Sequence, residues 1–297
     1  KNNAFFAEGR YWVNNHAHVL DATDKNLLDF IAIVINSMKL DDYITGSAQP
    51  KLSQDNLNKI PIVLPPLAEQ QRIIAEIKKW FTLIDQIEQD KADLQTTIEL
   101  TKSKILDLAI HGKLIPQDPN DEPAIELLKR INPDFTPCDN GHYTQLPEGW
   151  AICKMKQITS ITNGKSQKNV ETLNGIYPIY GSGGVIGRAN QYLCIAGSTI
   201  IGRKGTINNP IFVEEHFWNV DTAFGLKAND AILDKYLYYF CLSFDFSKLD
   251  KSTAMPSLTK TSIGNVLIPI PPYKEQERIV AKIDMVLDTM NEILRAV

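Results

Sequence analysis

The sequence has 297 residues and a formal net charge of −4, and 43% of its residues are hydrophobic. This apolar content can build a core, which excludes a globally disordered chain, and the length suits two domains of ~100–200 residues each. The negative charge excludes a protein that is basic all over, although basic residues can still gather on one surface.

Residues 1–64 repeat a segment near the end of the chain. An offset of 206 residues pairs Trp12 with Trp218 and Leu20 with Leu226, and it holds without a gap from about residue 6 onward. Chance similarity does not persist over such a span. We therefore expect two copies of one unit, with residues 1–64 as the C-terminal part of the first copy.

Residues 65–113 are predicted to form a long helix. Pro65 and Pro66 suit its entry, Gly112 suits its end, and no Gly or Pro occurs in residues 67–110. Apolar residues step by four and three alternately, which is the 3.5-residue period of a coiled-coil seam. This seam consists of Ile73, Ile77, Trp80, Ile84, Ile87, Leu94, Ile98, Ile105 and Leu108. The alternative is a helix packed on its own domain, but few domains match a length of about 68 Å.

The linker comes next, at residues 114–143, where five prolines surround one short predicted helix at 124–131. Residues 144–270 then carry β-rich runs at 177–180, 192–196, 198–201 and 210–213, separated by glycines, and a helical pattern at 231–242. We interpret this region as an α/β (α+β) domain with a curved, mainly antiparallel sheet.

Residues 271–297 repeat the helix entry, since P-P-x-x-E-Q-x-R-I occurs both at Pro65 and at Pro271. The same apolar period follows, and its seam consists of Ile279, Ile283, Val286, Met290 and Ile293. We expect the two long helices to pack side by side and antiparallel, and to hold the two repeated units apart.

Three polar stretches of the second unit are candidates for contact with DNA: the glycine-rich runs 180–192 and 201–209, and residues 248–260. Glycine lets a backbone approach closely, arginine can grip guanine at two atoms, and asparagine or glutamine can do the same for adenine. The candidates are Lys165, Ser182, Gly183, Arg188, Asn190, Gln191, Arg203, Lys204, Thr206, Asn208, Lys251, Thr253 and Lys260. Each stretch alone also fits a solvated hairpin. A nucleotide site is not expected, because G-x-x-x-x-G-K-[ST] is absent and the strand-to-helix context of a dinucleotide fingerprint is lacking.

No catalytic residue and no metal site are predicted. Pro271-Pro272-Tyr273 is similar to the motif of amino-methyltransferases, but Ile270 stands where that chemistry needs an Asn or Asp. The four cysteines form no C-x-x-C pair, which suits a reducing cytoplasm and argues against zinc. No run of about 18 apolar residues occurs, so we expect no membrane contact.

Together these motifs resemble the specificity subunit of type I restriction-modification enzymes. Both P-P-x-x-E-Q-x-R-I stretches carry the resemblance, together with residues 109–117, 121–124, 146–150 and 202–206. It implies target-recognition domains at 1–64 (incomplete) and 144–270, which read a split sequence in double-stranded DNA. It also implies DNA methyltransferase (modification) subunits docked on the helices, and a restriction or motor subunit.

The same resemblance implies that S-adenosylmethionine, ATP and magnesium are bound by those partners, and that this chain holds no cofactor. Two other classes of protein remain open from the sequence. One is a dimeric DNA-binding regulator that dimerises through the coiled coil, which needs no modification partner. The other is a coiled-coil scaffold that does not bind DNA.

Overall fold

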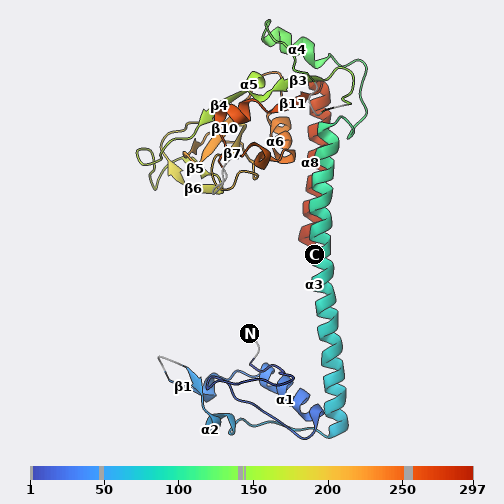
Figure 1. The fold of residues 1–297 in the computed structure, drawn as a ribbon, viewed down its shortest axis with the longest axis vertical. Coiled ribbons are helices and arrows are strands. Elements are labelled where there is room, and N and C mark those ends of the chain that lie inside the picture. The colour runs from blue at the N-terminus through green and yellow to red at the C-terminus, as the bar shows by residue number, and fades with distance from the viewer. Residues whose placement is uncertain (1–2, 47–49, 140–142, 144, 251–256, 297) are drawn as a thin grey trace. The chain divides into compact units, whose positions relative to one another are not determined.

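The structure, a computed structural model, describes residues 3–46, 50–139, 143, 145–250 and 257–296. The chain divides into two compact units, unit 1 at residues 1–93 and unit 2 at residues 94–297. The long helix α3 (Leu67–Ile110) belongs partly to each (Figure 1). No helix in the described part is both long and apolar enough to cross a membrane.

Unit 1 is small and largely open. Besides the start of α3 it contains α1 (Lys25–Ser37), the short helix η1 (Asp41–Tyr43), the antiparallel hairpin of β1 (Ile44–Thr45) and β2 (Lys51–Leu52), and α2 (Gln54–Leu57). Its few buried apolar residues include Phe30 on α1 and Ile74 on α3. Trp12 is almost fully exposed, whereas its counterpart Trp218 is buried. In unit 2, Trp218 packs with Val170 and Ile179, and its Nε1 donates to Lys165 O at 3.0 Å.

Helix α3 lies within the predicted range 65–113 and is five residues shorter, since it begins at Leu67 and ends at Ile110. It follows Pro65 and Pro66, and the Pro66 carbonyl oxygen accepts the Glu69 amide at 2.8 Å. It ends before Gly112, whose φ of 66° lies in the left-handed region that glycine adopts without strain. A Cβ at Gly112 would also lie 2.3 Å from Cγ of Pro147, so this helix end needs glycine for two reasons.

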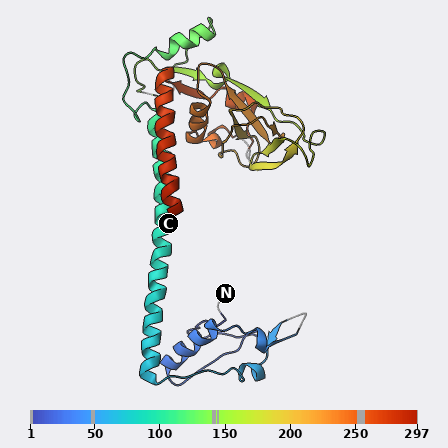
Figure 2. The ribbon, with the colours of Figure 1, turned by 180° about the vertical axis from the view of Figure 1, so that it is seen from behind.

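The second long helix, α8 (Tyr273–Ala296), lies beside the last turns of α3 and runs in the opposite direction (Figures 1 and 2). Leu106 and Ala109 of α3 share a hydrophobic core with Ile279 and Ile283 of α8. Further along, Lys102 Nζ donates to Asn291 Oδ1 at 3.4 Å. The antiparallel pairing that the repeat predicts is therefore present within unit 2.

The predicted seam is only partly buried. Ile98, Ile279, Ile283 and Met290 are buried, and the following residues are partly buried: Ile73, Ile77, Leu94, Ile105, Leu108 and Val286. Trp80, Ile84, Ile87 and Ile293 are exposed. Ile293 lies on α8 itself, and Trp80, Ile84 and Ile87 lie in the part of α3 that belongs to unit 1. The apolar period therefore does not by itself decide which seam residues are buried.

The linker is anchored to the first turns of α8. It contains α4 (Ala124–Ile131), with the predicted bounds. Asp121 accepts two hydrogen bonds from the Arg278 guanidinium, at 2.6 and 3.3 Å. Glu275 is buried and accepts from Gln117 Nε2 and Trp150 Nε1, both at 3.1 Å. Burial raises the pKa of Glu275 above its ordinary value, and these two hydrogen bonds oppose that shift.

Unit 2 is an α+β fold with mainly antiparallel strands, as expected. A four-stranded antiparallel sheet has the order β4-β10-β7-β8, β11 pairs with β3, and a third sheet has the order β6-β5-β9 with β5 and β9 parallel. The bounds are β3 (Ala151–Lys154), β4 (Thr159–Asn163), β5 (Tyr177–Gly181), β6 (Gly184–Ala189), β7 (Ser198–Gly202), β8 (Ile211–Val213), β9 (Trp218–Asn219), β10 (Ala223–Ala228) and β11 (Leu267–Ile270). The helices are α5 (Met155–Ile158), α6 (Asp234–Ser243), η2 (Phe246–Leu249) and α7 (Lys260–Gly264). Phe224 on β10 and Phe240 on α6 lie in the same core.

Two sequence-based expectations for unit 2 are wrong in detail. Residues 192–196 form no strand, because they meet their neighbour only at the isolated bridge between Cys194 and Phe217. The helix expected at 231–242 begins at Asp234 instead. The Gln276 side chain explains this start, because its amide donates to Ala231 O at 3.1 Å and accepts from Leu233 N at 2.8 Å.

Candidate nucleic-acid interface

The candidate interface is organised by residues 219–223, which connect β9 to β10. Their backbone accepts from Lys165 N at 3.0 Å through Asn219 O, and from Arg203 N at 2.7 Å through Thr222 O. Val220 N in turn donates to Tyr180 O at 2.9 Å. Three candidate segments that lie far apart in sequence therefore meet at this connection: the loop after β4, the β5–β6 hairpin and the turn after β7.

The turn after β7 presents Arg203 and Lys204. Both backbone amides donate to Thr222 O, at 2.7 and 3.3 Å, so the position of the turn is well defined. The Arg203 guanidinium carbon lies 5.8 Å from the centre of the Phe224 ring, a cation–π distance, and Lys204 is exposed. The turn can close tightly because a Cβ at Gly202 would lie 1.9 Å from Thr206 O, while Thr206 itself is exposed.

The first glycine-rich stretch forms a single hairpin, and its candidates lie at opposite ends. Ser182 and Gly183 form the turn between β5 and β6. Arg188 lies near the far end of β6, where its Nη1 donates to Ile176 O at 3.2 Å, and Asn190 and Gln191 follow it. The hairpin lies at the end of unit 2 away from α8 (Figures 1 and 2). All these side chains except the half-buried Ser182 are exposed.

Asn208 is placed differently from the other candidates, because its side chain is already occupied within the fold. Its Nδ2 donates to Asp245 Oδ1 at 2.7 Å, and its Oδ1 accepts from Phe246 N at 2.7 Å. Hydrogen bonds from Ser247 and Asn208 lower the pKa of Asp245. The amide nitrogen and oxygen that would contact adenine are therefore both hydrogen-bonded to the start of η2. We interpret Asn208 as a structural residue.

The third predicted stretch is only partly described. Lys251 and Thr253 lie outside the described residues. Lys260 is the exposed first residue of α7, which Thr259 caps by accepting from Ser262 N. The stretch contacts the Arg203 turn, because Leu258 N donates to Arg203 O at 2.8 Å and Lys204 forms an isolated antiparallel β-bridge with Ser257.

Replacing Asn208 by alanine is expected to lower the free energy of unfolding by about 1–3 kcal/mol, because the Phe246 amide loses its acceptor. The matched change is Asn190→Ala, at an exposed asparagine of the same unit, which should alter stability by less than about 0.5 kcal/mol. Urea denaturation followed by circular dichroism measures both. Equal stability of Asn208→Ala and the unchanged protein would contradict the structural role.

An aromatic cluster beside the hairpin was not foreseen. Tyr192 stacks on His216 with centroids 4.5 Å apart and planes at 20°, and Tyr177 meets the edge of Tyr192 at 5.2 Å. His216 Nδ1 accepts from Ala196 N at 2.9 Å, so the ring proton belongs on Nε2. These residues come from three separate segments, which is why no local sequence pattern indicated them.

Tyr180, on β5, meets the edge of the Phe217 ring, with the ring centroids 5.5 Å apart. Burial raises the pKa of its phenol, and the nearby Glu215 carboxylate adds to the shift. The hydroxyl is therefore neutral at physiological pH and can donate a hydrogen bond.

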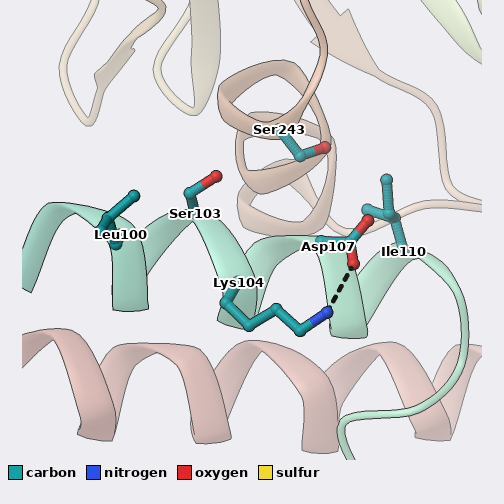
Figure 3. Close-up of a pocket in the computed structure, with 6 residues that line it drawn as sticks. All are labelled: Leu100, Ser103, Lys104, Asp107, Ile110 and Ser243. Carbon is teal, nitrogen blue, oxygen red and sulfur yellow. Dashed lines mark ion pairs between the residues drawn. The ribbon is translucent and has the colours of Figure 1, made fainter. Parts of the chain in front are cut away.

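One hollow lies elsewhere, between α3 and α6 (Figure 3). It holds about 330 Å³ and is lined by Leu100, Ser103, Lys104, Asp107, Ile110 and Ser243. Lys104 and Asp107 form an ion pair at 3.5 Å on its wall. None of the DNA candidates lines it, and the described residues contain no cluster of His, Cys, Asp or Glu that could hold a metal ion.

Comparison with known proteins gives consistent matches. The model of the type I restriction modification DNA specificity domain matches residues 3–96 and 147–297. The specificity subunit of the Escherichia coli type I restriction enzyme EcoAI is 25% identical, over 84% of this chain and 57% of its own length. A putative type I restriction enzyme specificity subunit from Haemophilus influenzae is 25% identical, over 97% of this chain and 71% of its own length.

Two solved structures share the fold. The HsdS subunit from Thermoanaerobacter tengcongensis aligns with a TM-score of 0.56 and 18% identity, over 90% of this chain and 64% of that one. A chain from a study of complex assembly and conformational transition of the type I R-M system aligns with a TM-score of 0.64 and 21% identity. That alignment covers 90% of this chain and 63% of the other. This chain thus spans less than two thirds of several of its relatives.

Proposed function

Because the chain belongs to the family of type I restriction-modification DNA specificity proteins, we propose that it reads the base sequence of double-stranded DNA for such an enzyme. Unit 2 supplies the reading surface for one half of a bipartite target. The reading itself makes and breaks no covalent bond, so the chain acts as a recognition subunit and not as a catalyst.

The observation that carries this proposal is the convergence on residues 219–223. Lys165, the β5–β6 hairpin and the Arg203 turn are all hydrogen-bonded to this connection. Exposed arginine, lysine, asparagine and glutamine side chains are the groups that read base edges and phosphates. The backbone that presents them is fixed by buried neighbours such as Asn219 and Phe224, so the readers are preorganised for DNA.

The proposal includes the partners that complete the reaction. Modification subunits dock on the long helices and transfer methyl groups from S-adenosylmethionine, and a motor subunit uses ATP and magnesium for translocation and cleavage. All of this takes place in the cytoplasm. Co-purification with a methyltransferase distinguishes this function from that of a dimeric regulator, which needs no such partner.

Arg203→Ala and Arg188→Ala are expected to weaken binding to the specific DNA by about 1–3 kcal/mol each, and to relax the preference at one base position if the arginine contacts a base. The specific sequence comes from selection of bound duplexes or from methylome sequencing of a host with and without the gene. Fluorescence anisotropy with labelled duplex at low salt measures the loss.

Arg130→Ala is the charge-matched control. It removes one positive charge from unit 2, on α4, where Arg130 pairs with Glu122 at 2.7 Å. This variant should bind DNA like the unchanged chain. Unchanged affinity of both interface variants would refute the assignment, and so would an equal loss in Arg130→Ala.

A further inference from the structure

The edge strand β6 exposes two neighbouring apolar side chains that the fold does not use. Val185 and Ile186 are 58% and 55% exposed. Residues 170–172 lie beside the far end of β6, where Thr172 N donates to Arg188 O at 2.9 Å and Ala189 bridges to Glu171. At Val185 and Ile186, β5 is the one neighbouring strand among the described residues, so this end of the edge is open. Exposed β-branched residues on a free sheet edge invite aggregation and are normally avoided, so two in succession suggest a binding role.

A β-bulge produces this arrangement. Val185 pairs with Tyr180, and Gly187 pairs with Ile179, so β6 holds one extra residue, Ile186, at this point. Without the bulge, alternation along the strand would turn one of two consecutive side chains toward the protein. Bulges often re-aim side chains beside functional sites.

The apolar pair lies within the candidate DNA interface. Ile186 comes near Gly181, since a Cβ built there would lie 3.7 Å from Ile186 Cγ2 and 3.8 Å from Val220 Cγ2. Val220 belongs to the connection that joins the three candidate segments. The turn residue Gly183 and the exposed Arg188 are on the same hairpin, one on each side of the pair.

Charge gives this surface a mixed character. Arg188 and Lys165 are basic, but Glu171 lies close to Gly187 and Asp221 is exposed in the connection. A purely electrostatic contact with phosphates would not need two aliphatic side chains between these groups. The ligand must therefore present an apolar group next to polar ones.

The major groove of DNA offers such a combination. It admits a two-stranded β-ribbon, and the C5 methyl of thymine is its characteristic apolar group, beside the hydrogen-bonding edges of the bases. We propose that the β5–β6 hairpin enters the major groove and that Val185 and Ile186 recognise thymine by contact with its methyl group. This inference rests on the proposed function and assigns the hairpin a base preference.

The test compares thymine with deoxyuridine, which lacks only the methyl group. The full chain is titrated with its selected target duplex, made once with thymine and once with deoxyuridine throughout the half-site of unit 2. We expect the uracil duplex to bind about fourfold more weakly for each methyl group that is contacted. Val185→Ala and Ile186→Ala should bind the thymine duplex more weakly and lose part or all of the preference for thymine, which completes a double-mutant cycle.

Leu173→Ala is the control, because Leu173 is an apolar residue of unit 2 that is 100% exposed and lies outside the hairpin. It should keep the full preference for thymine. Circular dichroism should give the same melting temperature for all three variants, since each truncated side chain is at least half exposed.

Equal binding of thymine and uracil duplexes by the unchanged chain would overturn the proposal, and sequence-specific binding would then leave the DNA-reading function intact. A selected half-site without thymine would overturn it as well. Absence of any sequence-specific binding would overturn both. If the hairpin variants bind DNA normally but lose a co-purifying methyltransferase, the pair is a protein-docking surface and the thymine assignment is wrong.

Discussion

Gly164→Ala is expected to lower the free energy of unfolding by about 3 kcal/mol or more and to abolish specific DNA binding. A Cβ at residue 164 would lie 1.8 Å from Val220 O and 2.4 Å from Val220 C. Overpacking against movable side chains already costs about 1–3 kcal/mol. Here the obstacle is backbone, and it is held in place by hydrogen bonds from Gly164 N to Ala223 O and from Lys165 N to Asn219 O, at 3.1 and 3.0 Å.

Gly183→Ala is the matched control at the hairpin turn. A Cβ there meets nothing within 4 Å, and Gly183 is not among the glycines with positive φ. Its stability should change by less than about 0.5 kcal/mol. Urea denaturation by circular dichroism compares the stability of the two variants, and DNA titration measures the loss of binding in Gly164→Ala. A Gly164→Ala protein with unchanged stability would show that the connection at 219–223 can move aside, and the interface would then not be preorganised.

Gly202 and Gly183 show why the role of a glycine cannot be predicted from the sequence alone. Residues 180–192 and 201–209 both look like flexible glycine-rich loops, and the sequence predicted close backbone approach in both. Gly202 makes such an approach, but to Thr206 of its own chain, whereas Gly183 faces open space. The sequence alone does not distinguish a glycine that the fold requires from a glycine that is free to approach DNA. The distinction depends on which residues lie next to each glycine in the folded protein.

Elements governed by local patterns were predicted well. Helices α3 and α4 begin and end where prolines and glycine indicate, at Leu67–Ile110 and Ala124–Ile131. Elements governed by distant contacts were not. The start of α6 depends on the Gln276 amide, more than forty positions away in the sequence, and the role of Asn208 depends on Asp245 and Phe246. No window of neighbouring residues contains that information.

The heptad seam lies between these two cases. Its period predicts an apolar face, but on α3 only Ile98 of the predicted positions is buried, whereas Ile74, Leu106 and Ala109 are buried outside the predicted seam. Burial of a given position also requires a partner at the same height, and this is why Ile98 is buried while Ile87 is exposed. The pattern therefore predicts a face capable of packing, and the partner helix decides which of its residues contribute to stability.

Ile283→Ala tests that distinction and should lower the free energy of unfolding by about 2–5 kcal/mol. Ile283 is fully buried on α8 in the core that contains Leu106 and Ala109 of α3. Truncation leaves a cavity beside α8, whose first turns are held to residues 117–150 by the Arg278–Asp121 pair and the Glu275 hydrogen bonds, so collapse around the missing methyl groups is restricted. Urea denaturation followed by circular dichroism measures the loss.

Ile293→Ala makes the same chemical change on the same helix, at another position of the predicted seam. Ile293 is 44% exposed, so alanine removes few packed neighbours and the free energy of unfolding should fall by less than about 1 kcal/mol. If every heptad position of the seam contributed equally to stability, the two variants would lose equal free energies of unfolding. Equal losses would mean that Ile293 is covered in solution, whereas a large loss for Ile283 alone would show that α3 and α8 stabilise each other mainly through the first turns of α8.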